Sequence, residues 1–359
     1  MLTSMDNFLE QERIKYKQNG LILCMSYKDC SKVFVSGTSM TTVPTKSNMN
    51  YRIGGQSIPI MTTLFLILVD KGYLKLNDKI GDFLPKVPNG NLITLQMLCN
   101  MRSGLPDVIN NPMVDEDMTT MVFKQWKTKE LLEIIYNSKP LYPPNERFYF
   151  GHITNMLLLG EAIKMKMNMN RSLKYLLTKY IFNPLNLESI EYNNTQNIKD
   201  PVFHTFTNDR IPYYEDSTFW NPSWGSYATK INSNANDVNV VAKNIGSGKL
   251  ISKELYNIQM SNPDMTTGQY YYGMGIAVGG FGLDYLVCKR IPHSILWTNE
   301  SEDGSFGIWA YIPRKRITVN IQSNTFNNDN FSINMILQDL LDTYNFEQMK
   351  DLVCDDFSF

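Results

Sequence analysis

The stretch YRIGGQSIPIMTTLFLILVDKGYLKLNDKIGDFLP, residues 51–85, decides the fold of this 359-residue chain. Ser57 can cap a helix, and Pro59 fits the first turn of that helix, where a missing N–H costs nothing. The run 60–69 is apolar on nearly every side, which predicts a buried helix. Gly72 stands where such a helix should end. The pattern by itself therefore predicts a buried helix and a following turn, and it requires no function.

Strand patterns lie at both ends of the chain and helical patterns lie between them. This order favours an α+β fold in which one antiparallel sheet is built from both chain ends and is flanked by terminal helices. We expect a single domain, 1–359, in two lobes: a sheet lobe of residues 1–57 and 230–359 and a mainly helical lobe of residues 58–229. The expected strands are 20–27 and 32–37, with a turn at Asp29–Ser31, and 271–280, 284–293, 306–314 and 316–324; the expected helices are 4–17, 128–138, 153–165, 172–182 and 332–344.

The charge balance excludes one broad class of partner. The chain has 34 basic and 35 acidic residues and a net charge of −1, with no long run of like charge. Because a nucleic-acid-binding protein needs a basic face, we expect no nucleic-acid partner. No apolar run reaches the roughly 18–20 residues that cross a bilayer. The charged, amphipathic segment 1–20 lacks the apolar core of a signal peptide, so we expect a cytoplasmic protein without membrane association.

Cysteine and histidine usage gives no sign of a metal or cofactor. The five cysteines are scattered and odd in number, without CxxC spacing, which predicts reduced structural thiols: Cys24, Cys30, Cys99, Cys288 and Cys354. There are only three histidines and no HExxH motif. A catalytic metal is therefore not expected, and no cofactor is expected either.

The order of several short motifs resembles one known family. LVDKGYLKLNDKIGDFLPKVPNGNLITLQMLCNMRSGLPD (68–107) follows the helix start, and further matching pieces follow in order: YPPNERFYF and LLLGEAI within 142–163, IFNPLNLESIEY (181–192), GKLISKEL (248–255), YYGMGIAVGG (271–280) and IWAYIPRKRITVNIQSN (308–324). Together, over roughly residues 6–345, they resemble the serine beta-lactamase and penicillin-binding-protein family, in particular its class C-related, esterase-like branch. The resemblance implies a beta-lactamase/transpeptidase-like fold and acyl-transfer chemistry.

The first family motif, Ser-x-x-Lys, is absent. In this family the serine at the start of the buried helix attacks a carbonyl, and the lysine one turn later helps to deprotonate it. The lead that usually precedes the motif is Tyr51-Arg52-Ile53-Gly54, which puts Gly55 at the nucleophile position and Ile58 at the lysine position. Neither side chain can perform the required step. No Ser-x-x-Lys occurs elsewhere in the chain.

The second and third motifs are altered as well. Tyr-x-Asn should fall within 148–153, and no register of that segment restores it, although Tyr149 remains a candidate for the cleft. The third motif, Lys or His followed by Thr/Ser-Gly, should fall at Trp297–Asn299 or Thr298–Glu300, where the basic residue is missing. The residues expected near an interlobe cleft are Tyr149, His152, His293, Trp297 and Thr298, with Trp220 and Trp224 as candidate rim residues.

Three functions remain open from the sequence. The first is a pseudoenzyme that acts as a binding or regulatory protein, with a small molecule or peptide as a ligand in the interlobe cleft. The second is a serine hydrolase of beta-lactamase, D-peptidase or esterase type with Ser57 as a displaced nucleophile and His152, Tyr149 or His293 as its base. Two residues along a helix correspond to about 200° of rotation, so Ser57 would face away from the original site. The third is a self-assembling structural protein, since some relatives form filaments, and this leaves a homo-oligomer open.

Overall fold

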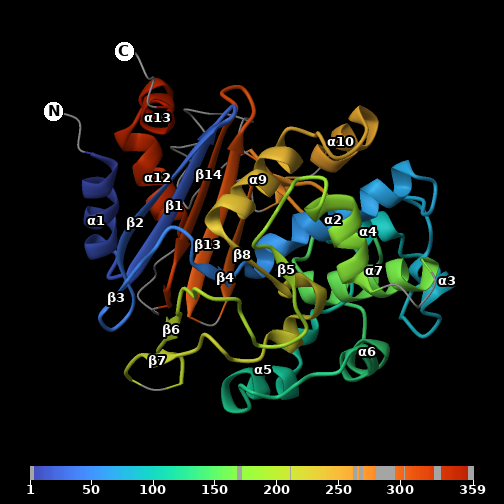
Figure 1. Cartoon of the computed structure of the whole chain (residues 1–359). Coiled ribbons are helices and arrows are strands. Elements are labelled where there is room, and N and C mark those ends of the chain that lie inside the picture. Colours follow the sequence, from blue (N-terminus) through green and yellow to red (C-terminus); the bar gives the residue numbers. More distant parts are fainter. Residues whose placement is uncertain are drawn as a thin grey trace.

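A nine-stranded antiparallel sheet forms the centre of the computed structural model, which describes residues 4–167, 172–210, 212–261, 265–266, 270–279, 296–302, 304–326 and 333–354. Strands from both ends of the chain make up the sheet, as the sequence predicts (Figure 1). In spatial order the strands are β3 (Val43–Pro44), β2 (Cys30–Met40), β1 (Gly20–Tyr27), β14 (Ile317–Ser323), β13 (Ser305–Ile312), β12 (Leu296–Glu302), β11 (Ala277–Val278), β10 (Tyr270–Tyr272) and β9 (Met265–Thr266).

The two chain ends meet where β1 pairs with β14. Leu23 lies between Phe34 of β2 and Ile321 of β14, and all three side chains are buried. β1, β13 and β14 are buried along almost their whole length, as expected for strands covered on both faces. The burial of these strands therefore reflects their central position in the sheet.

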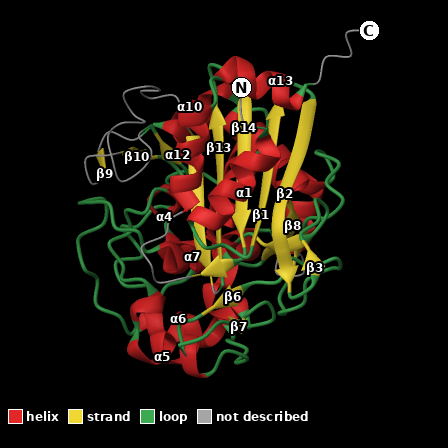
Figure 2. Cartoon of the chain, turned by 90° about the vertical axis from the view of Figure 1, so that its left-hand side faces the viewer, coloured by secondary structure: helices red, strands yellow, loops and turns green. Residues whose placement is uncertain are grey.

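Helices cover both faces of the sheet. Helix α1 (Met5–Lys15), α12 (Ile333–Thr343) and α13 (Phe346–Val353) pack on one face, where Figure 2 shows α1 in front of the strands. Phe8 of α1 meets Tyr344 edge-on, with 5.5 Å between the ring centroids. Helix α9 (Ala235–Gly246) lies across the other face against β1, β13 and β14 (Figure 1). The terminal helices thus flank the sheet as expected.

Helix α2 (Ser57–Asp70) is the buried helix that the opening stretch predicts. Twelve of its residues are buried, from Ser57 to Leu68, and it packs against α9 and α7.

The remaining helical elements are α3 (Ile80–Phe83), α4 (Leu95–Cys99), α5 (Pro112–Thr120), α6 (Thr128–Tyr136), α7 (His152–Lys166), α8 (Leu173–Leu177) and α10 (Lys253–Met260), with short turns η1 (Gly54–Gln56), η2 (Val108–Asn110), η3 (Thr178–Phe182) and η4 (Pro222–Ala228). Two small sheets complete the fold: β4 (Asn50–Arg52), β8 (Ile231–Asn234) and β5 (Glu191–Tyr192), and β15 (Thr325–Phe326), β6 (Phe206–Thr207) and β7 (Glu215–Asp216). Within the described ranges, no helix has the length and apolar content needed to cross a membrane.

Local differences from the sequence expectations have simple causes. The first hairpin turns at Lys28–Asp29, because Tyr27 pairs with Cys30 and Lys28 adopts a positive φ of 51°. The predicted helix 172–182 ends in the π-helical turn η3. The predicted strand 284–293 lies outside the described residues.

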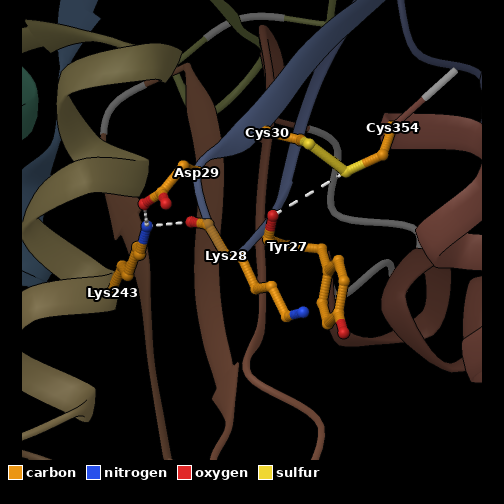
Figure 3. Close-up of a disulfide and its surroundings, with 6 residues drawn as sticks. All are labelled: Tyr27, Lys28, Asp29, Cys30, Lys243 and Cys354. Atoms are coloured by element: carbon orange, nitrogen blue, oxygen red, sulfur yellow. Dashed lines mark hydrogen bonds and ion pairs between the residues drawn. A yellow bond between two sulfur atoms is a disulfide. The ribbon is translucent and has the colours of Figure 1, made fainter. Parts of the chain in front are cut away.

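A disulfide bond contradicts the expectation that all the cysteines are reduced. Cys30, at the start of β2, is bonded to Cys354, just after α13, with 5.5 Å between the Cα atoms (Figure 3). This bridge could not be predicted from the sequence because the two residues are 324 positions apart and have no recognisable spacing. Cys24 and Cys99 are buried free thiols whose pKa values are raised because burial disfavours the thiolate, to about 12 for Cys24. Cys288 lies outside the described residues.

Replacing Cys354 by Ser should lower the free energy of unfolding by about 2–4 kcal/mol, because the bridge restrains a long loop of the unfolded chain. Urea unfolding monitored by circular dichroism measures the change. Cys30→Ser should cost the same, and the double variant no more than either single variant. A wild-type protein whose intact mass gains no hydrogens on reduction would contradict the bridge.

Candidate functional site

A backbone bond from a neighbouring small sheet holds the start of α2. The Ile53 N–H donates to the Ile231 carbonyl of β8 at 3.0 Å, which continues the pairing of β4 with β8. The chain then turns through η1, where Gly54 has a φ of 48°, a conformation that glycine adopts without strain. Strand β12 packs against this turn. The segment that carries the nucleophile in the resembled family is therefore fixed beside the central sheet.

The position expected to hold the nucleophile presents no reactive group. Gly55 is partly exposed and, unlike Gly54, does not have a positive φ, so the backbone would accept any L-amino acid there. One turn later, the side chain of Ile58 is only 2% exposed. The two substitutions are thus not imposed by local backbone geometry. Gly55 lacks the hydroxyl and Ile58 lacks the amine of the family motif, while the η1 turn is present.

Ser57 does not take over as an exposed hydroxyl. The residue is 0% exposed, and its Oγ has no hydrogen-bond partner among the residues that the structure describes. The expected capping role is wrong, because η1 already has helical geometry and Gln56 occupies the N-cap position without a side-chain bond. A buried hydroxyl without a partner destabilises the fold by about 1–3 kcal/mol.

Neutral amides support the turn from the sheet. Gln56 is fully buried, and its Nε2 donates to Oε1 of Gln322 on β14 at 3.5 Å. Asn320, on the same face of β14, donates through Nδ2 to the Tyr51 hydroxyl at 3.1 Å. These contacts hold Gln56 and Tyr51, on either side of Gly54 and Gly55, to the sheet through uncharged amides.

Thr298 lies on this same face of the sheet. It pairs with Trp309, and Trp309 pairs with Asn320, so side-chain alternation puts all three positions on the face toward Tyr51. Thr298 is half-buried. Thr298 therefore lies on the strand that packs against the η1 turn. The backbone of Trp297 in β12 pairs with Ala310 of β13. The side chain of Trp297 and the whole of His293 lie outside the described part of the chain.

The Tyr149 hydroxyl is engaged with the helical part of the molecule. It accepts a hydrogen bond from Asn110 Nδ2 of η2 at 2.8 Å. Its ring meets Tyr142 edge-on at 6.3 Å between centroids, and Arg147 stacks on Tyr142. Tyr149 is thus a packed, half-buried residue.

His152 is held by a buried carboxylate at the start of α7. The oxygens of Asp107 accept from the N–H groups of Ile153 and Thr154 at 3.2 and 3.0 Å, which caps the helix. The His152 Nδ1 lies 3.3 Å from Asp107 Oδ2, but its direction is outside hydrogen-bond geometry. The imidazole is 21% exposed and stacks on Phe150, with 4.7 Å between ring centroids. No described serine, threonine or cysteine side chain is bonded to His152, so the His–Asp pair has no adjacent nucleophile.

An aromatic cluster links this loop to the edge of the sheet. Tyr272 of β10 lies 5.2 Å from Phe148 and 5.8 Å from Phe150, measured between ring centroids. Tyr272 is buried, whereas Phe150 is 47% exposed. The candidate rim residues Trp220 and Trp224 are both buried and serve packing. The exposed apolar surface beside His152 therefore comes from Phe150.

The structure brings together only part of the expected site. The η1 turn and Thr298 of β12 are neighbours on the sheet, while the Tyr149 hydroxyl is bonded to Asn110 and the His152 Nδ1 lies 3.3 Å from Asp107 Oδ2 without a hydrogen bond. The supporting roles of Asp107, Tyr272 and Gln322 were not found from the sequence. Their contacts join segments more than 40 residues apart, and no local spacing marks them.

Comparison with known proteins places the fold. A D-amino acid amidase from Ochrobactrum anthropi SV3 superposes with a TM-score of 0.80 at 17% identity, covering 96% of this chain and 98% of the amidase. A D-stereospecific amidohydrolase from a Streptomyces species gives 0.78 at 18% identity, covering 89% and 94%. An octameric penicillin-binding protein homologue from Pyrococcus abyssi gives 0.75 at 20% identity, covering 96% and 78%.

At these identities the superpositions establish a shared beta-lactamase/transpeptidase-like fold and no shared activity. The sequence itself also matches the family model described as Beta-lactamase, over residues 6–341, which is nearly the whole chain. The matched range includes the α2 start, the loop before α7 and the β12 strand. The chain belongs to the beta-lactamase family.

Proposed function

We propose that this protein is a pseudoenzyme of the beta-lactamase family that acts as a binding or regulatory protein without serine hydrolase activity. Its ligand, a small molecule or a peptide, would enter the cleft between the sheet lobe (1–57 and 230–359) and the helical lobe (58–229). Tyr149, His152, His293, Trp297 and Thr298 remain the proposed residues near that ligand. The proposal includes no metal and no cofactor.

The observation that carries the proposal is the state of the α2 start. Gly55 is partly exposed and free of backbone constraint, and Ile58 is packed in the core. Acyl transfer requires a nucleophile and a base in hydrogen-bond reach of each other. A site that keeps the turn and the sheet while lacking both groups is better suited to holding a ligand than to cleaving one.

A hydrolase with Ser57 as its nucleophile is the main alternative. The solved structures with this fold include amidohydrolases and an esterase-like hydrolase, EstCE1. Against this alternative, Ser57 is completely buried and has no base bonded to it within the described residues. A substrate could reach its Oγ only if η1 moved.

We expect no covalent adduct when the purified protein is treated with a fluorescent penicillin or a fluorophosphonate, because Ser57, the candidate nucleophile, is completely buried and has no base bonded to it among the described residues. Intact-mass spectrometry measures the adduct, and a competent family member serves as the positive control. Ser57→Ala is the matched variant. An adduct that forms on the wild type and disappears in Ser57→Ala would establish the displaced nucleophile and refute the proposal.

Restoring the motif provides a second test. The double variant Gly55→Ser, Ile58→Lys should react with the fluorophosphonate at position 55, because the backbone there accepts a side chain. The reaction should be slower than that of a competent enzyme by about two to four orders of magnitude, since the other two motifs remain altered. Gly55→Ala, Ile58→Lys is the control. Equal labelling of the two double variants would mean that the scaffold no longer supports acylation.

A self-assembling structural role is favoured by one comparison only, the octameric homologue from Pyrococcus abyssi. Light scattering coupled to gel filtration distinguishes this role from that of a monomeric binder. We expect a mass that does not change with protein concentration. Growth of the particle mass with concentration would favour assembly.

A further inference from the structure

A cavity of about 450 Å³ opens on the part of the molecule formed by α7, η4, β5 and the segment before α6. Its wall includes three lysines and three aromatic residues: Lys127, Lys164, Lys230, Trp126, Tyr192 and Tyr227. No aspartate or glutamate is among the residues that line it. None of the family motif positions lines it either, so the cavity is separate from the cleft of the proposed function.

Tyr227 is positioned by a glycine and by a kink. The ring packs on α7 at Gly160, where a Cβ atom would come within 2.2 Å of the ring. Ser226, inside η4, has a φ of 50°, and this kink turns the chain before Tyr227. The Tyr227 hydroxyl then donates to Glu161 Oε1 and accepts from Lys164 Nζ at 3.1 Å.

Lys230 has no such polar partner. Lys164 is paired with Glu161 at 2.7 Å, whereas no hydrogen bond or ion pair joins the Lys230 Nζ to any described residue. The Lys230 Nζ lies over the face of the Tyr227 ring, 5.2 Å from the ring centroid. The Lys164 Nζ lies 5.8 Å from the same centroid. The ammonium groups of Lys164 and Lys230 therefore lie near the same aromatic ring. Among the described residues, Lys164 is paired with a carboxylate and Lys230 is not.

The surroundings favour the neutral amine of Lys230. Its pKa is lowered to about 8, first because burial disfavours the ammonium ion and second because Lys164 is close; Glu161 opposes the shift. The other ionisable groups that face the cavity are Lys127 and the buried phenols of Tyr192 and Tyr227, whose pKa values are raised mainly by burial. Those phenols therefore stay neutral at physiological pH and supply no negative charge that would oppose the lowered pKa of Lys230.

We propose that Lys230 is a reactive amine that forms an imine with aldehydes carrying an anionic group. Burial beside another cationic group is a known way of activating lysine for attack on carbonyl compounds. Trp126, Tyr192 and Tyr227 supply flat apolar surface for the body of such a molecule, and Lys127 supplies a cation for its anionic group.

The reaction balances without any other reagent. The neutral Nζ attacks the aldehyde carbon and forms a C–N bond, and the carbonyl oxygen becomes the hydroxyl of a carbinolamine after proton transfer from the nitrogen. Loss of that hydroxyl with a proton releases one water molecule and leaves the C=N bond. No oxidation or reduction takes place in this step.

The test uses pyridoxal 5′-phosphate below one equivalent at pH 7, followed by borohydride, which reduces the imine to a stable amine. Peptide mapping then gives the labelled site. Lys230 should be labelled at least about tenfold faster than an exposed lysine such as Lys129, because a larger fraction of its amine is unprotonated at this pH. Lys230→Arg keeps the charge and should remove only this label. Pyridoxal, which lacks the phosphate, should label Lys230 more slowly.

Two further variants separate a reactive amine from an accessible one. Lys164→Gln removes the neighbouring cation and should move the pH midpoint of Lys230 labelling upward, whereas Glu161→Gln should move it downward. Circular dichroism confirms that each variant is folded. If wild-type Lys230 is labelled no faster than Lys129, or if its midpoint is unchanged in folded variants, the proposal is wrong. Equal rates with pyridoxal would overturn the requirement for an anionic group.

Discussion

The pairing of β1 with β14 is the constraint on which the rest of the structure depends. It joins the two ends of the chain in the middle of the central sheet, with Leu21 opposite Ser323 and Tyr27 opposite Ile317. Everything between these strands must leave the sheet and return to it. The η1 turn at the α2 start and β12 are brought side by side by that return, so this part of the candidate site follows from a contact far from it.

The site combines a structural frame with altered motif positions. Three contacts or conformations build the frame: the positive φ of Gly54, the β8 bond to Ile53 and the carboxylate cap of α7 by Asp107. Gly55 and Ile58 stand at the positions expected for the family's serine and lysine, and the Tyr149 hydroxyl is bonded to Asn110. The residues that build the frame are not the residues at the motif positions, so the motif positions can change without unfolding the frame.

The Lys230 cavity is the reverse case. There, burial and a neighbouring charge create a reactive environment at a position that no family motif marks.

Much of the fold could be predicted from the sequence, since periodicity and motif order are properties of neighbouring residues. The apolar run of α2, the strands β1, β13 and β14 and the stripe of α12 all follow from such patterns. Contacts between distant segments could not be predicted in this way. The Cys30–Cys354 bridge, the bond of Tyr149 to Asn110 and the burial of Ser57 depend on how the elements meet in space. The motif positions Gly55 and Ile58 could be assigned from the sequence because they lie at a fixed spacing in one short stretch.

The late closure of the sheet has a consequence for synthesis of the chain. β1 emerges from the ribosome about three hundred residues before β14, its partner. At typical translation rates of about 5–20 residues per second, one edge of β1 stays unpaired for roughly 15–60 s until that partner has been made. During this time only the hairpin with β2 covers it, and both faces of the strand are apolar. The nascent chain therefore depends on protection of this edge, by its own α1 or by a chaperone, until β14 has been made.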